Sequence, residues 1–162
     1  MIDSLKATYN IDAKRVYATG HSNGAGMSYR LACELSNKIA AIAPNAGQSM
    51  LKNCTPSRPV PILHIHGTED TCANYKGGIC GGCFNDFIGI KNATEGWECL
   101  SVENNAKSFA IKNSCNEAYE VIIDNADINC KTYENCKDNT EVTLCSIKGA
   151  GHTWPSGNYG LK

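Results

Sequence analysis

Short apolar runs recur along the chain, and each is closed within a few residues by glycine. They cover residues 15–19, 39–43, 59–65 and 141–147. Runs of this length that are rich in β-branched residues predict strands. Because the runs alternate only weakly between apolar and polar residues, they favour parallel strands that are buried on both faces.

Helical spacing of apolar residues fills the intervals between these runs. Residues 23–36 place apolar side chains such as Met27 and Leu31 on one face, and residues 101–113 show a similar pattern before the last run. Residues 3–9 predict a short helix at the N-terminus. A helix that joins two strands forms a parallel βαβ unit. The predicted fold class is therefore α/β, with a mostly parallel sheet flanked by helices.

Ten cysteines are the strongest compositional signal. Seven of them fall in 71–99 and 114–140. Residues 71–99 are also rich in glycine and asparagine, so we predict a long loop tied by disulfides there. For the cysteine-rich segment 114–140 we predict one strand near 119–123. A dense, even set of cysteines indicates an oxidising compartment, so we expect a secreted, extracellular protein.

Charge and hydropathy exclude several kinds of partner. The chain has 15 basic and 16 acidic residues without a basic stripe, so we expect no nucleic-acid partner. No apolar run reaches the roughly 18 residues that cross a membrane, so we expect no membrane partner. A chain of 162 residues suits one domain, 1–162. Its first residues lack the apolar segment of a secretion signal, so we expect further residues ahead of Met1.

The pentapeptide at 20–24, Gly-His-Ser-Asn-Gly, matches the G-x-S-x-G nucleophile elbow. A predicted strand precedes it and a predicted helix follows it, as the elbow requires. The sharp turn presents the hydroxyl of Ser22 above the sheet, and the helix N-terminus offers N–H groups to a developing oxyanion. The alternative is an ordinary strand-to-helix turn with a capping serine.

A nucleophilic serine needs a base and an orienting carboxylate, which follow in the order Ser, acid, His in α/β-hydrolases. Asp70 comes just after the third predicted strand, and His152 comes just after the fourth. Sites gather at the carboxyl ends of parallel strands. We predict Asp70 as the acid and His152 as the base, with Glu69 and Asp124 as alternatives for the acid.

Two other patterns have a catalytic or metal-binding interpretation. His64 and His66 alternate along one strand, which resembles a metal pair, but no further ligands accompany them. We expect no metal, and we expect His66 to pack near the acid loop. Cys80 and Cys83 have the CxxC spacing of zinc or redox sites, but structural disulfides to other cysteines are favoured. On nearness in sequence alone, two pairs are expected: Cys136 with Cys145, and Cys115 with Cys130.

Three segments together, 20–27, 59–70 and 149–155, resemble the polyhydroxybutyrate depolymerase and feruloyl esterase family of secreted serine esterases. The resemblance implies an α/β-hydrolase fold with Ser22, Asp70 and His152 as the triad, and with the backbone N–H of Asn23 as one oxyanion donor. His21 and Trp154, which flank the nucleophile and the base, are the candidate substrate-binding residues.

The same resemblance implies that members of this family carry further strands ahead of this segment and a final helix after it. We therefore expect a truncated catalytic domain, the C-terminal part of the full one. The expected activity is hydrolysis of feruloyl or acetyl esters of plant cell-wall polysaccharide, without a cofactor. The alternatives are a polyhydroxyalkanoate depolymerase, with a polyester substrate, and a non-catalytic carbohydrate-binding remnant.

Overall fold

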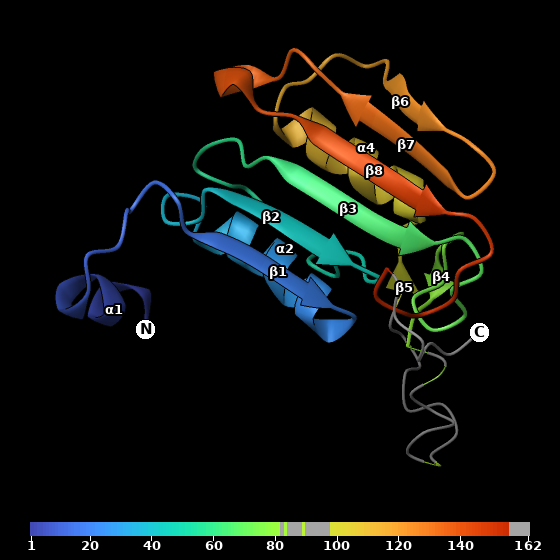
Figure 1. The fold of residues 1–162 in the computed structure, drawn as a ribbon, viewed down its shortest axis with the longest axis horizontal. Helices are drawn as coiled ribbons and strands as arrows, with labels where there is room; N and C mark the ends of the chain where they lie inside the picture. Colours follow the sequence, from blue (N-terminus) through green and yellow to red (C-terminus); the bar gives the residue numbers. More distant parts are fainter. Residues whose placement is uncertain (82, 84–88, 90–97, 156–162) are drawn as a thin grey trace.

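A computed structural model describes residues 1–81, 83, 89 and 98–155 of the chain. Its main feature is a six-stranded sheet with the order β1-β2-β3-β8-β7-β6 (Figure 1). The first four strands in that order are parallel, and the last two are antiparallel additions at one edge. The strands are β1 (Tyr17–His21), β2 (Ala41–Asn45), β3 (Ile62–Gly67), β8 (Val142–Ile147), β7 (Ile128–Tyr133) and β6 (Glu120–Asp124).

Helices α2 (Asn23–Glu34) and α4 (Val102–Lys112) lie on the same face of this sheet (Figure 1). Helix α2 connects β1 with β2 and packs against both, whereas α4 contacts β8. The remaining elements are small: α1 (Ile2–Thr8), the two-stranded sheet of β4 (Gly78–Ile79) and β5 (Glu98–Cys99), and the 3₁₀ turn η1 (Lys137–Asn139). The two-stranded sheet lies beyond the carboxyl end of β3 (Figure 1).

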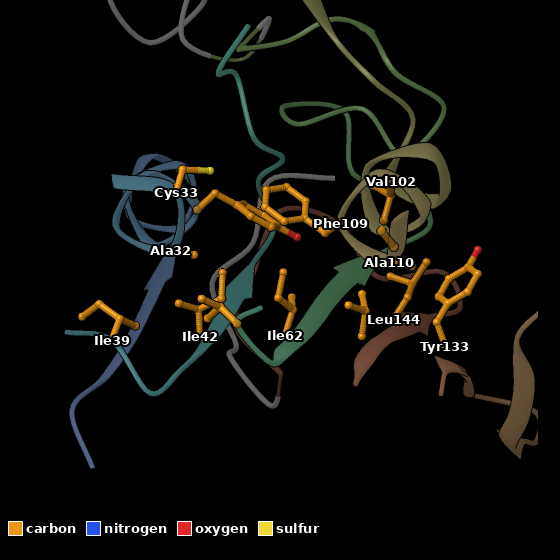
Figure 2. Packing of buried hydrophobic residues seen from close by; sticks show 14 residues of the cluster. Ala32, Cys33, Ile39, Ile42, Ile62, Val102, Phe109, Ala110, Tyr133 and Leu144 are labelled. Carbon is orange, nitrogen blue, oxygen red and sulfur yellow. The ribbon is translucent and has the colours of Figure 1, made fainter. Parts of the chain in front are cut away.

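The core fills the space between the two helices and the sheet. Figure 2 shows Ala32 of α2 and Phe109 of α4 on the helix side, with Ile42 and Ile62 on the strand side. These side chains are at most 4% exposed. Small residues on the helices bring the helix axes close to the strands. Close packing of this kind resists displacement of either helix relative to the sheet.

The opposite face of the sheet is open within the described residues, which have no helix there (Figure 1). Along β3 the residues alternate, so that Ile62 is 3% exposed and Leu63 is 41% exposed. Tyr17 of β1 is 65% exposed. The prediction of strands buried on both faces is therefore wrong for this part of the chain, since helices cover one face only.

Five disulfides join all ten cysteines. The pairs are Cys33–Cys54, Cys72–Cys83, Cys80–Cys99, Cys115–Cys136 and Cys130–Cys145. Both pairs expected from nearness in sequence are wrong. Sheet register decides one pair, because Cys130 of β7 lies directly opposite Cys145 of β8. The other forms because backbone hydrogen bonds bring 113–116 beside 134–137.

The predicted mostly parallel α/β architecture is confirmed for the described residues, with element boundaries that differ by up to three residues. The strand predicted near 119–123 is β6, and the helix predicted over 101–113 is α4. The sequence did not predict β7. Part of the predicted loop 71–99 lies outside the described residues. Among the described helices, none is both long and apolar enough to cross a membrane.

Candidate active site

Ser22 lies in the turn between β1 and α2 and has an unusual backbone conformation. Its φ is 57° and its ψ is −118°, a positive-φ conformation that costs free energy for any residue except glycine. The backbone holds it there: its N–H donates to the carbonyl of Asn45 at 3.0 Å, and its own carbonyl accepts from Ala25 at 2.9 Å. The turn therefore joins the ends of β1 and β2 to the start of α2.

Two glycines make this turn sterically possible. A Cβ on Gly20 would lie 2.4 Å from backbone atoms of Gly24, and a Cβ on Gly47 would lie 2.5 Å from the carbonyl oxygen of Ser22. Contacts this short do not occur between real atoms. The strand before the turn and the loop after β2 therefore need glycine at these two positions.

Asp70 follows β3, and its carboxylate is completely enclosed by donors. Its Oδ1 accepts backbone N–H groups from Cys72 and Ala73, each at 2.8 Å. Its Oδ2 accepts from Nδ1 of His152, also at 2.8 Å. Burial alone would raise the pKa of Asp70, but the hydrogen bonds from His152, His66 and the backbone hold that pKa well below its usual value. The side chain is therefore a buried carboxylate that stays ionised.

The two alternative acids lie away from His152. Glu69 is exposed. Asp124 lies at the end of β6, where its 60% exposed side chain pairs with Lys148 at 3.1 Å. Of the three predicted candidates, the structure brings Asp70 alone to the base.

His152 lies in the loop after β8 and is 9% exposed. The ring of His21 lies beside it, with centroids 4.6 Å apart. The side-chain amide of Asn45 donates to Nδ1 of His21 at 2.8 Å and to the carbonyl of Thr153 at 3.0 Å, so it ties β2 to the loop of His152. Burial and, next in size, the nearby His152 lower the pKa of His21. The ring of Trp154 lies 5.9 Å from His21.

Ser22 and His152 line the same cavity, which has a volume of about 60 Å³. Asn23 and Gln48 line it too, and the cystines 72–83 and 80–99 contribute to its wall. Gln48 is 3% exposed, and its amide nitrogen donates to the carbonyl of Asn74 at 2.9 Å. Its Oε1 is buried and has no hydrogen-bond partner among the described residues.

His66 of β3 lies next to the acid loop, as predicted. Nε2 of His66 lies 3.2 Å from Oδ2 of Asp70 and 2.7 Å from the carbonyl of Ala73. Cys80 and Cys83 are both in disulfides, each with a cysteine outside the CxxC pair. Over the described ranges, no group of three histidine, cysteine, aspartate or glutamate side chains is arranged to hold a metal ion.

Asn45 and Gln48 were not predicted as site residues. The sequence carried a signal for them, because they are polar and come at and just after the carboxyl end of an apolar strand, where sites gather. Which side chain each one contacts follows from strand order, which the sequence pattern alone does not provide.

No family model matches the chain. It is 37% identical over 155 residues to feruloyl esterase B of Piromyces equi, which covers 93% of this chain and 27% of that protein. It is 30% identical over 153 residues to the bifunctional acetylxylan esterase/xylanase XynS20E of Neocallimastix patriciarum, or 94% of this chain and 20% of that protein. The chain therefore spans about a quarter of the length of these relatives or less, and both are named as esterases.

A solved structure, the acetyl xylan esterase from Aspergillus awamori, has a similar fold. The TM-score is 0.56 at 15% sequence identity, and the match covers 96% of this chain and 60% of that one. At this identity the likeness describes the fold, which is α/β with a mostly parallel sheet.

Proposed function

We propose that the chain carries the catalytic site of a serine esterase of the α/β-hydrolase kind, with Ser22 as nucleophile, His152 as base and Asp70 as acid. One observation carries the proposal: a serine in a positive-φ turn and a histidine bonded to a buried carboxylate line the same cavity. Similarity to proteins named as esterases over more than nine tenths of the chain supports it.

Acylation begins when Oγ of Ser22 attacks the ester carbonyl carbon and its proton passes to Nε2 of His152. Nδ1–H of His152 remains bonded to Asp70, whose negative charge stabilises the imidazolium. The negative charge that develops on the carbonyl oxygen faces the N-terminus of α2, where the backbone N–H of Asn23 is the proposed donor.

Collapse of the tetrahedral intermediate breaks the ester C–O bond. The leaving alkoxide takes the proton from His152, and the acyl group stays on Ser22. Water then attacks the acyl-enzyme, gives its proton to His152, and releases the acid and the free serine. This proposed sequence uses no metal and no organic cofactor.

The substrate that we propose is a feruloyl or acetyl ester on plant cell-wall polysaccharide. The names of the relatives support this class, since they include a feruloyl esterase and an acetylxylan esterase. Trp154 is 44% exposed near the base and offers a flat apolar surface against which a sugar ring can stack. Five disulfides support an extracellular location, where such polymers occur.

Labelling of the chain with a fluorophosphonate tests the triad. Intact mass and peptide mapping should show one adduct on Ser22, and Ser22→Ala should remove it and lower esterase turnover by about 10⁶. Ser28→Ala, which removes a buried hydroxyl from the helix that follows Ser22, is the matched control and should label as the parent does. A folded chain without an adduct, or with an adduct on another residue, would refute the assignment.

A panel of esters tests the substrate class. Methyl ferulate and acetylated xylan should be hydrolysed, and a hydroxybutyrate oligomer should not. Faster turnover of the oligomer would instead favour the polyester depolymerase. Binding to xylan that survives Ser22→Ala, without hydrolysis of any ester, would favour a carbohydrate-binding module.

A further inference from the structure

Four buried polar side chains form a row behind Asp70 that the proposed mechanism does not use. Tyr29 comes from α2, His64 and His66 from β3, and Asn105 from α4. Each is at most 1% exposed. Polar groups this deeply buried are costly unless every donor meets an acceptor. Their hydrogen bonds therefore have to fit together, and the fit determines where each proton lies.

At the end next to the acid, the proton position on His66 is fixed by its neighbours. Its Nε2 faces two groups that only accept, the carbonyl of Ala73 at 2.7 Å and the carboxylate of Asp70 at 3.2 Å. Nε2 must therefore carry a hydrogen. Ala73 contacts both residues, because its carbonyl accepts from His66 and its N–H donates to Oδ1 of Asp70.

At the far end, Asn105 fixes the direction of the row. Its Oδ1 accepts the backbone N–H of Ser49 at 3.1 Å, so its Nδ2 is the atom that donates to the hydroxyl of Tyr29 at 2.8 Å. Burial raises the pKa of Tyr29 well above its usual value, which keeps the phenol protonated. With one proton received from Asn105, the hydroxyl directs its own proton to Nδ1 of His64 at 2.7 Å.

The two histidines connect these ends in a single consistent way. Burial lowers the pKa of His64 well below its usual value, so the ring is neutral and carries one proton. Because its Nδ1 accepts from Tyr29, that proton lies on Nε2 and points to Nδ1 of His66 at 2.9 Å. The rings lie parallel within 8°. A proton on Nδ1 of His66 would leave the phenol proton of Tyr29 without an acceptor.

We propose that His66 is a positioning residue for Asp70, and that the row from Asn105 through Tyr29 and His64 locks His66 in the Nε2–H tautomer. This rests on the proposed role of Asp70 as the acid. Locked in this way, His66 gives Oδ2 of Asp70 a second donor besides His152. Together with the two backbone donors on Oδ1, it keeps the carboxylate from rotating while His152 gains and loses its proton.

Proton-detected ¹⁵N NMR of the histidine rings tests the tautomers without any ester chemistry. His64 and His66 should both appear as Nε2–H rings at about pH 8. A doubly protonated His66, or an Nδ1–H form of His64, would overturn the proposal. The expected tautomers in a chain that forms no adduct on Ser22 would support the row while refuting the proposed function.

Tyr29→Phe removes the hydroxyl that donates to His64 and accepts from Asn105, and it keeps the ring that packs against Phe109. His64 should then lose its single tautomer, and the Nε2–H signal of His66 should change with it. Tyr133→Phe removes a hydroxyl from the same core but outside the row, so both rings should keep their parent spectra. Unchanged spectra in Tyr29→Phe would overturn the proposal that Asn105 and Tyr29 determine the tautomers of the two histidines.

His66→Leu tests the effect on the acid. Without the His66 donor, more negative charge stays on Asp70 and holds a proton on His152 more tightly. Fluorophosphonate labelling should slow roughly tenfold, and its acid limb should move to higher pH. Besides Asp70 and His64, Tyr75 faces this ring among the described residues, edge-on at 5.9 Å, and its hydroxyl is bonded to Ser146.

His66→Gln supplies an amide donor in place of the ring and should restore part of the labelling rate and of the pH profile. A loss in His66→Leu that leaves the pH profile unchanged, with no recovery in His66→Gln, would mean that the ring only fills space. That result would overturn the positioning role.

Discussion

Ser22 and Asp70 both follow parallel strands on one sheet, yet different interactions hold them in place. Backbone geometry holds Ser22, through a positive φ and two glycines that leave no room for a Cβ. Hydrogen bonds hold Asp70, through donors from the backbone and from His66 and His152. Steric constraints are satisfied or violated outright, whereas hydrogen bonds can be weakened one at a time. A substitution that fills the space of either glycine should therefore disrupt the turn of Ser22 in one step. Substitutions of the donors to Asp70 should instead lower the activity by smaller, separate amounts.

Among substitutions that keep Ser22, the largest effect is expected when the acid loses its charge. Asp70→Asn should lower esterase turnover by about 10⁴, because a neutral amide no longer holds His152 in the required tautomer or stabilises its charged form. Steady-state hydrolysis of methyl ferulate measures this loss. Glu69→Gln removes the same charge from the exposed neighbouring residue and should leave turnover unchanged. Equal losses in the two variants would mean that net charge near the loop matters, rather than the bond to His152.

A smaller effect is expected when the backbone of the nucleophile turn has to shift. In Gly47→Ala the new Cβ would meet the carbonyl of Ser22, so we expect a loss of about 1–3 kcal/mol in the free energy of unfolding. The displaced serine should react about 10² more slowly with a fluorophosphonate.

Gly24→Ala is the control for this substitution, because a Cβ there would have nothing within 4 Å. Because Gly24 lies inside helix α2, the change to alanine should raise the free energy of unfolding by about 0.5–1 kcal/mol. Urea titration measures this difference. If Gly47→Ala had the same free energy of unfolding and the same labelling rate as the parent, backbone geometry would not be what holds Ser22.

The smallest effect is a pH dependence of stability on the acid side. Burial lowers the pKa of His64 in the folded chain, so below about pH 6.5 the unfolded chain binds a proton that the folded chain does not. Above that pH, His64 does not reduce the free energy of unfolding. As the pH falls below it, the free energy of unfolding decreases by at most about 1.4 kcal/mol per pH unit. Asp70, whose pKa is also lowered, adds a similar loss only below about pH 4.

Urea unfolding at pH 7, 6 and 5 measures this slope. His64→Gln should flatten the slope in that window, since it removes the group that titrates on unfolding. Equal slopes in the parent and the variant would assign the pH dependence to other groups.

The sequence predicted the parallel part of the sheet because its strands are apolar and end at glycine. It did not predict β7, half of whose residues are polar and whose pairing with β8 includes the cystine 130–145. Register also explains the wrong cysteine pairs, because Cys130 bonds to Cys145, the residue opposite it on β8, rather than to a cysteine nearer in sequence. Long-range pairing depends on the whole sheet and leaves no local pattern.

For the candidate site, chain order placed Ser22, Asp70 and His152 after three different strands, and the structure joins Asp70 to His152 and brings Ser22 to the same cavity. Alternation along β3 put His64 and His66 on one face. What the sequence could not provide was their partners, Tyr29 and Asn105. Those two lie on helices whose docking angle depends on packing rather than on any local pattern.

The disulfides around the cavity have an evolutionary consequence. Cys83 and Cys99 are joined to Cys72 and Cys80, and the N–H of Cys72 holds Asp70. Cys83 and Cys99 are therefore two covalently fixed points of the chain. Insertions, deletions and substitutions between those points can accumulate without displacing the carboxylate. Descendants of one ancestral gene can then vary in this segment while they inherit the same carboxylate in the same place.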